Sequence, residues 1–189
     1  MELVRAEGRY LEELKKVYLE AFPREERKPF GLMEEWEKEG KLEILAIVED
    51  ETFIGLDINM LAPGTELALL DYFAIAPELR GGGYGSRALE LILERFAGQQ
   101  FIFEIEPEDE TAENAMQRRR RRSFYLRNGL LPSGLLVSLF QVPFELLSTK
   151  PGLRFSDYET VIGRTLGKPY MEMARPALLK DTGNGKRIK

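Results

Sequence analysis

The sequence predicts one domain of the α/β (α+β) class, with helices packed on a mixed sheet. Three observations lead to this prediction. The 189 residues are 43% hydrophobic and 31% charged, which is typical of a soluble globular domain with one core. Three strand patterns follow one another across short turns, which favours an antiparallel meander. A fourth strand pattern comes after a loop and a helix, and such a unit favours parallel pairing.

The first half of the chain contains two predicted helices and the meander. Apolar residues at helical spacing predict a helix that ends at Phe22-Pro23. A second helix carries Phe30, Met33 and Trp36 on one face, and this spacing favours core packing over a pocket-lining role. The three strands of the meander are expected at residues 41–48, 52–60 and 66–76, with Pro77 after the third.

The second half begins with a glycine-rich loop and an amphipathic helix that ends at Gly98. The fourth strand pattern covers residues 101–106. A helix that begins somewhere after Thr111 is predicted to end at Asn128-Gly129, because Gly suits the left-handed position after a helix. Two closing strands are expected at residues 135–140 and 142–147.

The end of the chain is expected to hold one more helix and a tail. Ser156-Asp157-Tyr158-Glu159 fits the capping box of a helix that runs toward Gly167. The weak pattern after this point predicts a flexible C-terminal tail at residues 168–189. We therefore place a single domain at residues 1–167.

The composition excludes several classes of site. The chain has no Cys and no His, which excludes disulfides, Cys/His zinc sites, imidazole bases and Ser-His-Asp triads, and we predict no metal site. The net charge of -5 has the wrong sign for a protein whose main partner is nucleic acid. No apolar run approaches the roughly 18 residues of a membrane span. We expect a cytoplasmic protein without a nucleic-acid or membrane partner.

The glycine-rich loop predicts an anion site. Gly81, Gly82, Gly83 and Gly85 lie between a strand and a helix and leave backbone N–H groups uncovered at the helix N-terminus. Unpaired N–H groups and the helix dipole both favour negative charge. The alternative is that the glycines only permit a tight turn.

Two other phosphate loops are compared with this one. A Walker A loop needs Lys and then Ser or Thr after its last Gly, and Ser86-Arg87 follows Gly85 here. A dinucleotide fingerprint fits Gly83-x-Gly85-x-x-Ala88, with Glu104 about 20 residues on as the ribose-binding acid. However, the first Gly of this fingerprint should follow the strand directly, and here residues 77–82 come between the strand and Gly83. Too few strand–helix units follow to build a doubly wound sheet. Dinucleotide binding stays open as a lesser alternative.

Two motifs together resemble those of the GNAT superfamily of N-acetyltransferases. Arg80-x-x-Gly83-x-Gly85 resembles its acetyl-CoA-binding loop, and Phe124-Tyr125 with Gly129-Leu130 looks like its later Phe-Tyr-x-x-x-Gly-Phe segment. The resemblance covers most of the chain. It implies a GNAT-like, mostly antiparallel central sheet of about seven strands flanked by helices, in which a splayed parallel pair forms the acetyl-CoA slot.

The resemblance also implies a cosubstrate, acetyl-CoA, and the residues that hold it. The pantetheine arm would pair with the main chain of Phe73, Ala74 and Ile75 like an added strand. A backbone N–H near Phe73 would polarise the thioester carbonyl. The diphosphate would lie on the N–H groups of the loop, whose residues are Arg80, Gly81, Gly82, Gly83, Tyr84, Gly85 and Ser86.

Acetyl transfer needs an acid and a base. Tyr125 matches the general-acid tyrosine of the family, and its ordinary pKa of about 10 is not far above that of a thiol at about 8.5. The alternative is that Tyr125 only packs. Glu104 matches a position where some family members carry a glutamate beside the amine. Glu106, Asp71 or water are the other candidate bases, and Glu104 and Glu106 should point to one sheet face.

A run of charge precedes Tyr125. Six acids lie between Glu104 and Glu113, and five consecutive arginines follow at 118–122. The favoured interpretation is a solvated surface whose charges neutralise one another. The alternative is that the acids attract a cationic substrate and that some arginines bind the 3′-phosphate of coenzyme A.

These observations predict an enzyme that moves the acetyl group of acetyl-CoA to a primary amine by direct attack in a ternary complex. The alternative is a catalytically silent GNAT-like domain that binds coenzyme A or an acyl form as a sensor or structural ligand. Small amines, an antibiotic, a peptide N-terminus and a lysine side chain all stay open as acceptors. The closing strands could pair across the edge of a homodimer.

Overall fold

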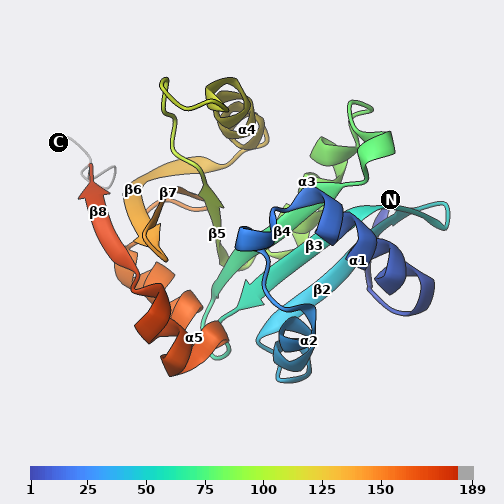
Figure 1. Cartoon of the computed structure of the whole chain (residues 1–189), viewed down its shortest axis with the longest axis horizontal. Helices are drawn as coiled ribbons and strands as arrows, with labels where there is room; N and C mark the ends of the chain where they lie inside the picture. Colours follow the sequence, from blue (N-terminus) through green and yellow to red (C-terminus); the bar gives the residue numbers. More distant parts are fainter. Residues whose placement is uncertain (183–189) are drawn as a thin grey trace.

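A single eight-stranded sheet organises the computed structural model, which describes residues 1–182. The strand order is β1-β2-β3-β4-β5-β7-β6-β8, and only β4 and β5 pair in parallel (Figure 1). The strand bounds are β1 Glu2–Arg5, β2 Leu42–Glu49, β3 Thr52–Leu61, β4 Leu67–Ile75, β5 Gln100–Ile105, β6 Leu131–Leu139, β7 Val142–Ser148 and β8 Ala177–Asp181. The predicted mixed, mostly antiparallel sheet is confirmed, with eight strands in place of about seven.

Helices cover both faces of the sheet in residues 1–182. The α-helices are α1 Gly8–Ala21, α2 Phe30–Lys38, α3 Tyr84–Arg95, α4 Ala115–Arg127 and α5 Phe155–Ala174, and the short 3-10 helices are η1 Arg24–Glu26 and η2 Pro77–Leu79. The larger apolar core joins α1, α2 and α5 to one face, while α3 and α4 pack on the other. No helix in this part of the chain is long and apolar enough to cross a membrane.

The C-terminal segment departs from the prediction of a flexible tail. Helix α5 continues to Ala174 past Gly167, which has a φ of 77° and kinks the helix just before Pro169. Strand β8 then pairs with β6 and forms the last edge of the sheet. Residues 168–181 are therefore part of the fold. The sequence pattern does not predict this strand, because its hydrogen bonds come from a distant neighbour, β6. The rest of the predicted tail, 183–189, lies outside the described residues.

The start of α5 also differs from the predicted capping box. The residue that caps this helix is Arg154, whose backbone N–H donates to the Asp157 carboxylate at 3.0 Å. Ser156 lies inside the first turn, so the box begins two residues earlier than expected. Tyr158 lies on the buried face of this helix, and its side chain is fully buried.

A β-bulge in β4 sets the geometry on which the site depends. Asn59 of β3 pairs with Leu70, and Ile58 pairs with Tyr72, so Asp71 is the extra residue. The parallel pairing of β4 with β5 ends at Leu70 and Phe103. Beyond this point β4 continues to Ile75 with β3 on one side and without β5 on the other. The predicted splayed parallel pair is confirmed.

Gly55 allows β3 to approach β4 in the splayed region. A Cβ atom at Gly55 would lie 2.3 Å from the carbonyl oxygen of Ala74, which no real Cβ contact allows. We predict that Gly55→Ala lowers the free energy of unfolding by about 1–3 kcal/mol, because the added methyl group forces the two strands apart. Urea denaturation followed by circular dichroism measures the change.

Gly31→Ala is the matched control. Gly31 lies in α2, and nothing is within 4 Å of its added Cβ. This variant should leave the free energy of unfolding unchanged or raise it by up to about 1 kcal/mol. Equal urea midpoints for the two variants would show that the β3–β4 contact is not tight.

Candidate active site

The free edge of β4 carries three of the predicted cosubstrate residues. Phe73, Ala74 and Ile75 pair with β3 and lie beyond the last β5 partner of β4. All three are half-buried. A strand edge of this kind can accept an extended ligand through main-chain hydrogen bonds.

The 3-10 helix η2 joins this edge to the glycine loop. Helix α3 begins at Tyr84, and its N-cap is Gly83, which has a left-handed φ of 81°. Within residues 1–182, the backbone N–H groups from Gly81 to Ser86 donate no hydrogen bond. Arg80 Nε donates to the Ile75 carbonyl at 3.0 Å and so joins the loop to the end of β4. The structure therefore places the free amides next to the free strand edge.

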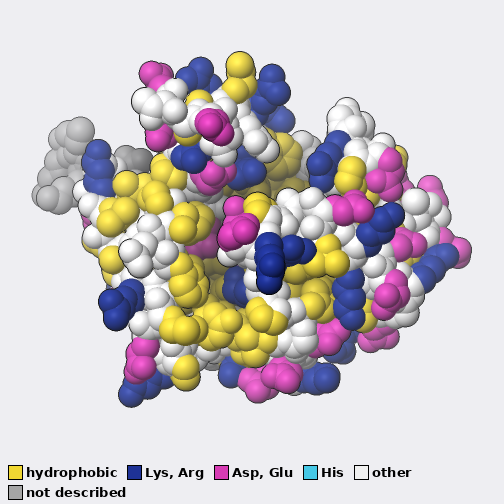
Figure 2. Space-filling model, in the orientation of Figure 1, with side chains coloured by type: hydrophobic (Ala, Val, Ile, Leu, Met, Phe, Trp, Pro, Cys, Tyr) yellow, Lys and Arg dark blue, Asp and Glu magenta, His cyan; other side chains and the backbone are white. Residues whose placement is uncertain are grey.

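Helix α4 flanks the loop from the other side of the splay. A Cβ at Gly85 would lie 3.6 Å from the Phe124 ring, so the start of α3 touches α4. Farther out, Figure 2 shows a hollow in this face between α4 and the N-terminal end of α3. The two motifs that lie about 40 residues apart in the sequence are thus brought together.

Tyr125 follows Phe124 on α4 and points into the smaller apolar core. Its ring lies 5.3 Å from the ring of Phe103, and 9% of the residue is exposed. Burial raises the pKa of the Tyr125 hydroxyl to about 12, with a further contribution from the charge of Asp57, while Arg121 opposes the rise. The hydroxyl is therefore protonated at neutral pH, as a proton donor requires, and it is a weaker acid than the sequence suggested.

A buried polar cluster lies at the bulge, on the opposite face of the sheet. The Asp71 carboxylate forms an ion pair with Lys28 Nζ at 2.7 Å, and its second oxygen is buried without a partner among the described residues. Tyr72 also turns to Lys28, whose backbone N–H donates to the Tyr72 hydroxyl at 3.1 Å. The Tyr18 hydroxyl donates to the Lys28 carbonyl at 3.1 Å. Lys28 is therefore fixed at both its backbone and its side chain.

Glu104 is the second carboxylate of this cluster. It extends from β5 toward α5 and accepts a hydrogen bond from the Tyr158 hydroxyl. Burial of the carboxylate raises the pKa of Glu104 to about 7, and the charge of Asp71 contributes to the rise, while the Tyr158 bond and Lys28 oppose it. A carboxylate with a pKa near neutrality is suited to act as a general base.

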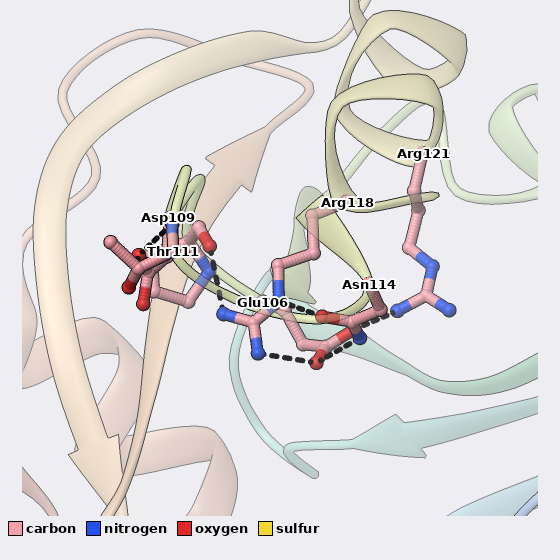
Figure 3. A network of polar contacts seen from close by, with 7 residues as sticks. Glu106, Asp109, Thr111, Asn114, Arg118 and Arg121 are labelled. Atoms are coloured by element: carbon pink, nitrogen blue, oxygen red, sulfur yellow. Dashed lines mark hydrogen bonds and ion pairs between the residues drawn. The ribbon is translucent and has the colours of Figure 1, made fainter. Parts of the chain in front are cut away.

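Glu106 has a different environment, although it was the alternative base on the same strand pattern. It lies just after β5 and forms ion pairs with Arg118 at 3.2 Å and Arg121 at 2.9 Å (Figure 3). Asn114 donates to the same carboxylate at 3.1 Å. Its carboxylate is therefore engaged by Asn114 and by two arginines of α4.

The arginine run is largely paired with acids, as its favoured interpretation predicted. Arg119 forms an ion pair with Glu110 at 3.6 Å, and Arg122 forms one with Glu145 of β7 at 2.9 Å. Together with the two bonds to Glu106, these contacts attach α4 to the end of β5 and to β7. The exposed members of this set each contribute little to stability, because water screens their charges.

Sequence reasoning missed Lys28 and Tyr158. Lys28 lies in a charged connector that has no motif, and only the fold brings it to the bulge. Tyr158 did leave a signal in the sequence, because it shares the buried face of α5 with Val161, Ile162 and Thr165. A tyrosine on a core face needs a hydrogen-bond partner, and Glu104 is that partner.

The fold and the loop together define a class of domain with one splayed parallel strand pair beside an amide-lined turn. The sequence model of the acetyltransferase (GNAT) family matches residues 10–124, which is more than half of the chain. The chain therefore belongs to the GNAT acetyltransferase family, whose members use acetyl-CoA. The family resemblance seen in the sequence is confirmed.

Solved structures share this fold. A protein from Bacteroides thetaiotaomicron assigned to the GNAT family has a TM-score of 0.68 at 23% identity, over 88% of this chain and 98% of that chain. An aminoglycoside 6'-N-acetyltransferase complexed with coenzyme A has a TM-score of 0.60 at 15% identity, over 82% and 100% of the two chains. A spermidine N-acetyltransferase chimera from Vibrio cholerae and hSSAT has a TM-score of 0.60 at 16% identity, over 78% and 93%. No curated protein matches this chain significantly in sequence.

The raised pKa of Glu104 predicts a specific dependence of stability on pH. The neutral carboxyl group fits the folded protein better than the charged one, so its contribution is complete below the ordinary pKa of 4.5 and is lost as pH rises through about 7. Between pH 5 and pH 8 the wild type should lose up to roughly 3 kcal/mol relative to Glu104→Gln. Urea denaturation at each pH measures this difference.

Glu108→Gln controls for the loss of a carboxylate near β5, because Glu108 is exposed. Its unfolding free energy should follow the wild-type pH dependence. A Glu104→Gln profile parallel to that of the wild type would contradict the raised pKa.

Proposed function

We propose that the chain transfers the acetyl group of acetyl-CoA to a primary amine by direct attack in a ternary complex, without a covalent enzyme intermediate. One observation carries this proposal: the unpaired edge of β4 leads, through η2, into a loop whose amides, from Gly81 to Ser86, have no partner within residues 1–182. An extended arm that ends in a diphosphate fits this arrangement.

The residues around the slot would divide the binding of acetyl-CoA. The main chain of Phe73, Ala74 and Ile75 would pair with the pantetheine arm, and the loop amides with the helix dipole of α3 would hold the diphosphate. A backbone N–H near Phe73 would donate to the carbonyl oxygen of the thioester as negative charge develops there. Acetyl-CoA would supply the acetyl group and the thiolate leaving group.

Two side chains would move the protons. Glu104 would take a proton from the acceptor ammonium, since its pKa of about 7 keeps it partly ionised at neutral pH. The amine then attacks the thioester carbon, the carbon–sulfur bond breaks, and Tyr125 would give its proton to the departing thiolate. The second proton of the attacking nitrogen would return to the Tyr125 phenolate, which leaves the neutral amide. Tyr158 is a positioning residue, because it touches Glu104 and stabilises its charged form.

Release of free thiol from acetyl-CoA against a panel of primary amines tests this function.

Gly83→Val should abolish saturable coenzyme A binding or weaken it at least tenfold, because a branched side chain strains the left-handed turn and covers the loop amides. Isothermal titration with coenzyme A measures the affinity.

Gly152→Val is the matched control for this variant. Gly152 has a φ of 85°, close to the 81° of Gly83, and nothing is within 4 Å of its added Cβ. The control therefore carries similar backbone strain away from the loop, and its coenzyme affinity should stay at the wild-type value. Equal affinities for both variants would place the diphosphate elsewhere. Binding without thiol release from any amine would favour the silent alternative.

The roles of Tyr125 as acid and Glu104 as base can be tested by separate kinetic measurements. Tyr125→Phe should lower kcat at least tenfold with an unchanged affinity for coenzyme A, since the ring is retained and only the proton is lost. Tyr158→Phe should move the rising limb of the pH–rate profile above pH 7, because the lost hydrogen bond no longer lowers the pKa of Glu104. An unmoved limb in Tyr158→Phe would exclude Glu104 as the base.

A further inference from the structure

A pocket of about 470 Å³ lies between α1, η1 and α2, outside the slot described above. Its size is within the range of sites that hold small molecules. Four of its eight lining residues are cations and none is an acid: the cations are Lys15, Arg24, Arg27 and Lys28. In Figure 2, basic side chains lie over this part of the face. We call it the α1–α2 pocket.

The two arginines of the α1–α2 pocket lack carboxylate partners. The guanidinium group of Arg24 has no hydrogen bond or ion pair with any of residues 1–182, and Arg27 makes only a 3.4 Å hydrogen bond to the Leu19 carbonyl. The two lysines are engaged, Lys15 with Glu34 at 3.1 Å and Lys28 with Asp71 at 2.7 Å. The two cations without a carboxylate partner therefore lie on the η1 side of the pocket.

The acids next to these arginines in the sequence form no ion pair with them among residues 1–182. Glu26 interacts with the charges of Glu106 and Arg121, so it faces α4 across the splay. No ion pair joins Glu25 to any residue of 1–182. Several cations in one concave site focus a positive potential, which raises the local concentration of anions.

The rest of the lining is apolar. Tyr18, Leu19, Pro29 and Phe30 complete the wall, and Leu19 keeps 59% of its surface exposed although it is a large aliphatic residue. Phe30 is therefore at the pocket wall, while its helix neighbours Met33 and Trp36 are in the core. This combination suits a ligand with an anionic group beside a short apolar part.

One residue connects the α1–α2 pocket to the carboxylate cluster. Lys28 lines the pocket, and its Nζ reaches Asp71 at the bulge. Tyr18 also lines the pocket, and the centre of its ring lies 4.9 Å from the centre of the Tyr72 ring. The α1–α2 pocket and the carboxylate cluster therefore share Lys28 as a common wall.

We propose that the α1–α2 pocket binds a carboxylate or phosphate group through Arg24 and Arg27, and that this group belongs to the acceptor. The acceptors would then be primary amines that carry an acidic group, such as amino acids or aminoalkyl phosphates. Guanidinium groups match the planar geometry of both anions. The assignment of this group to the acceptor rests on the proposed function. The anion site itself rests only on the α1–α2 pocket.

Matched pairs of amines test the acceptor. The pairs are 4-aminobutyrate with 4-aminobutanamide, and O-phosphoethanolamine with ethanolamine, compared by thiol release from acetyl-CoA. We expect the acidic member of each pair to have a KM at least tenfold lower. Arg24→Ala should remove this preference by raising the KM of the acidic member of each pair. Lys16→Ala, which removes an exposed cation of α1 that does not line the pocket, should retain it.

Isothermal titration with 4-acetamidobutyrate, an acid without an amine to acetylate, tests the anion site independently of catalysis. Arg24-dependent binding of this probe together with the KM preference supports the whole proposal. Such binding without the preference supports the anion site but assigns it to a separate anion and overturns the acceptor assignment. Neither binding nor preference, with thiol release intact, overturns the proposal. Binding without any thiol release leaves the anion site and refutes the proposed function.

Discussion

The β-bulge at Asp71 is the constraint on which the site depends. One extra residue in β4 ends its pairing with β5 and leaves a strand edge with unused hydrogen-bonding groups in the middle of a sheet. A free edge is ordinarily a liability at the margin of a sheet, and here it is protected by its position between two covered faces. The same bulge turns both Asp71 and Tyr72 toward Lys28, so the slot and the polar cluster have one structural origin.

Desolvation sets the chemistry of the two carboxylates beside the splay. Asp71 and Glu104 are removed from water, and burial raises the pKa of both. The ammonium group of Lys28 opposes the rise in the pKa of Asp71. The direct partner of Glu104 is the neutral hydroxyl of Tyr158. The pKa of Glu104 reaches about 7, so this carboxylate can hold a proton near neutral pH.

Several features could be predicted from sequence because they are local. The glycine loop, the meander and the amphipathic faces of α1 and α3 depend on residues within one or two turns of each other. The predictions failed where contacts with a distant segment determine the structure of a residue. Residues 168–181 join the fold because β6 offers an edge, and Tyr158 finds its hydrogen-bond acceptor in Glu104, on a strand 54 positions earlier in the chain. The cations of the α1–α2 pocket are separated by up to 13 positions in the chain and converge only when α1 and α2 pack.

The sequence by itself determined the expectation of acetyl-CoA as the donor, since glycines in the right order between a strand and a helix predict a backbone anion site. Tertiary structure alone decided the proposed acceptor side. The pKa of Glu104, the pairing of Lys28 and the lack of a carboxylate partner for Arg24 and Arg27 all depend on burial and on contacts between distant segments. Electrostatic interactions change with their surroundings far more than local backbone geometry does, which is why the two sides differ in what could be predicted.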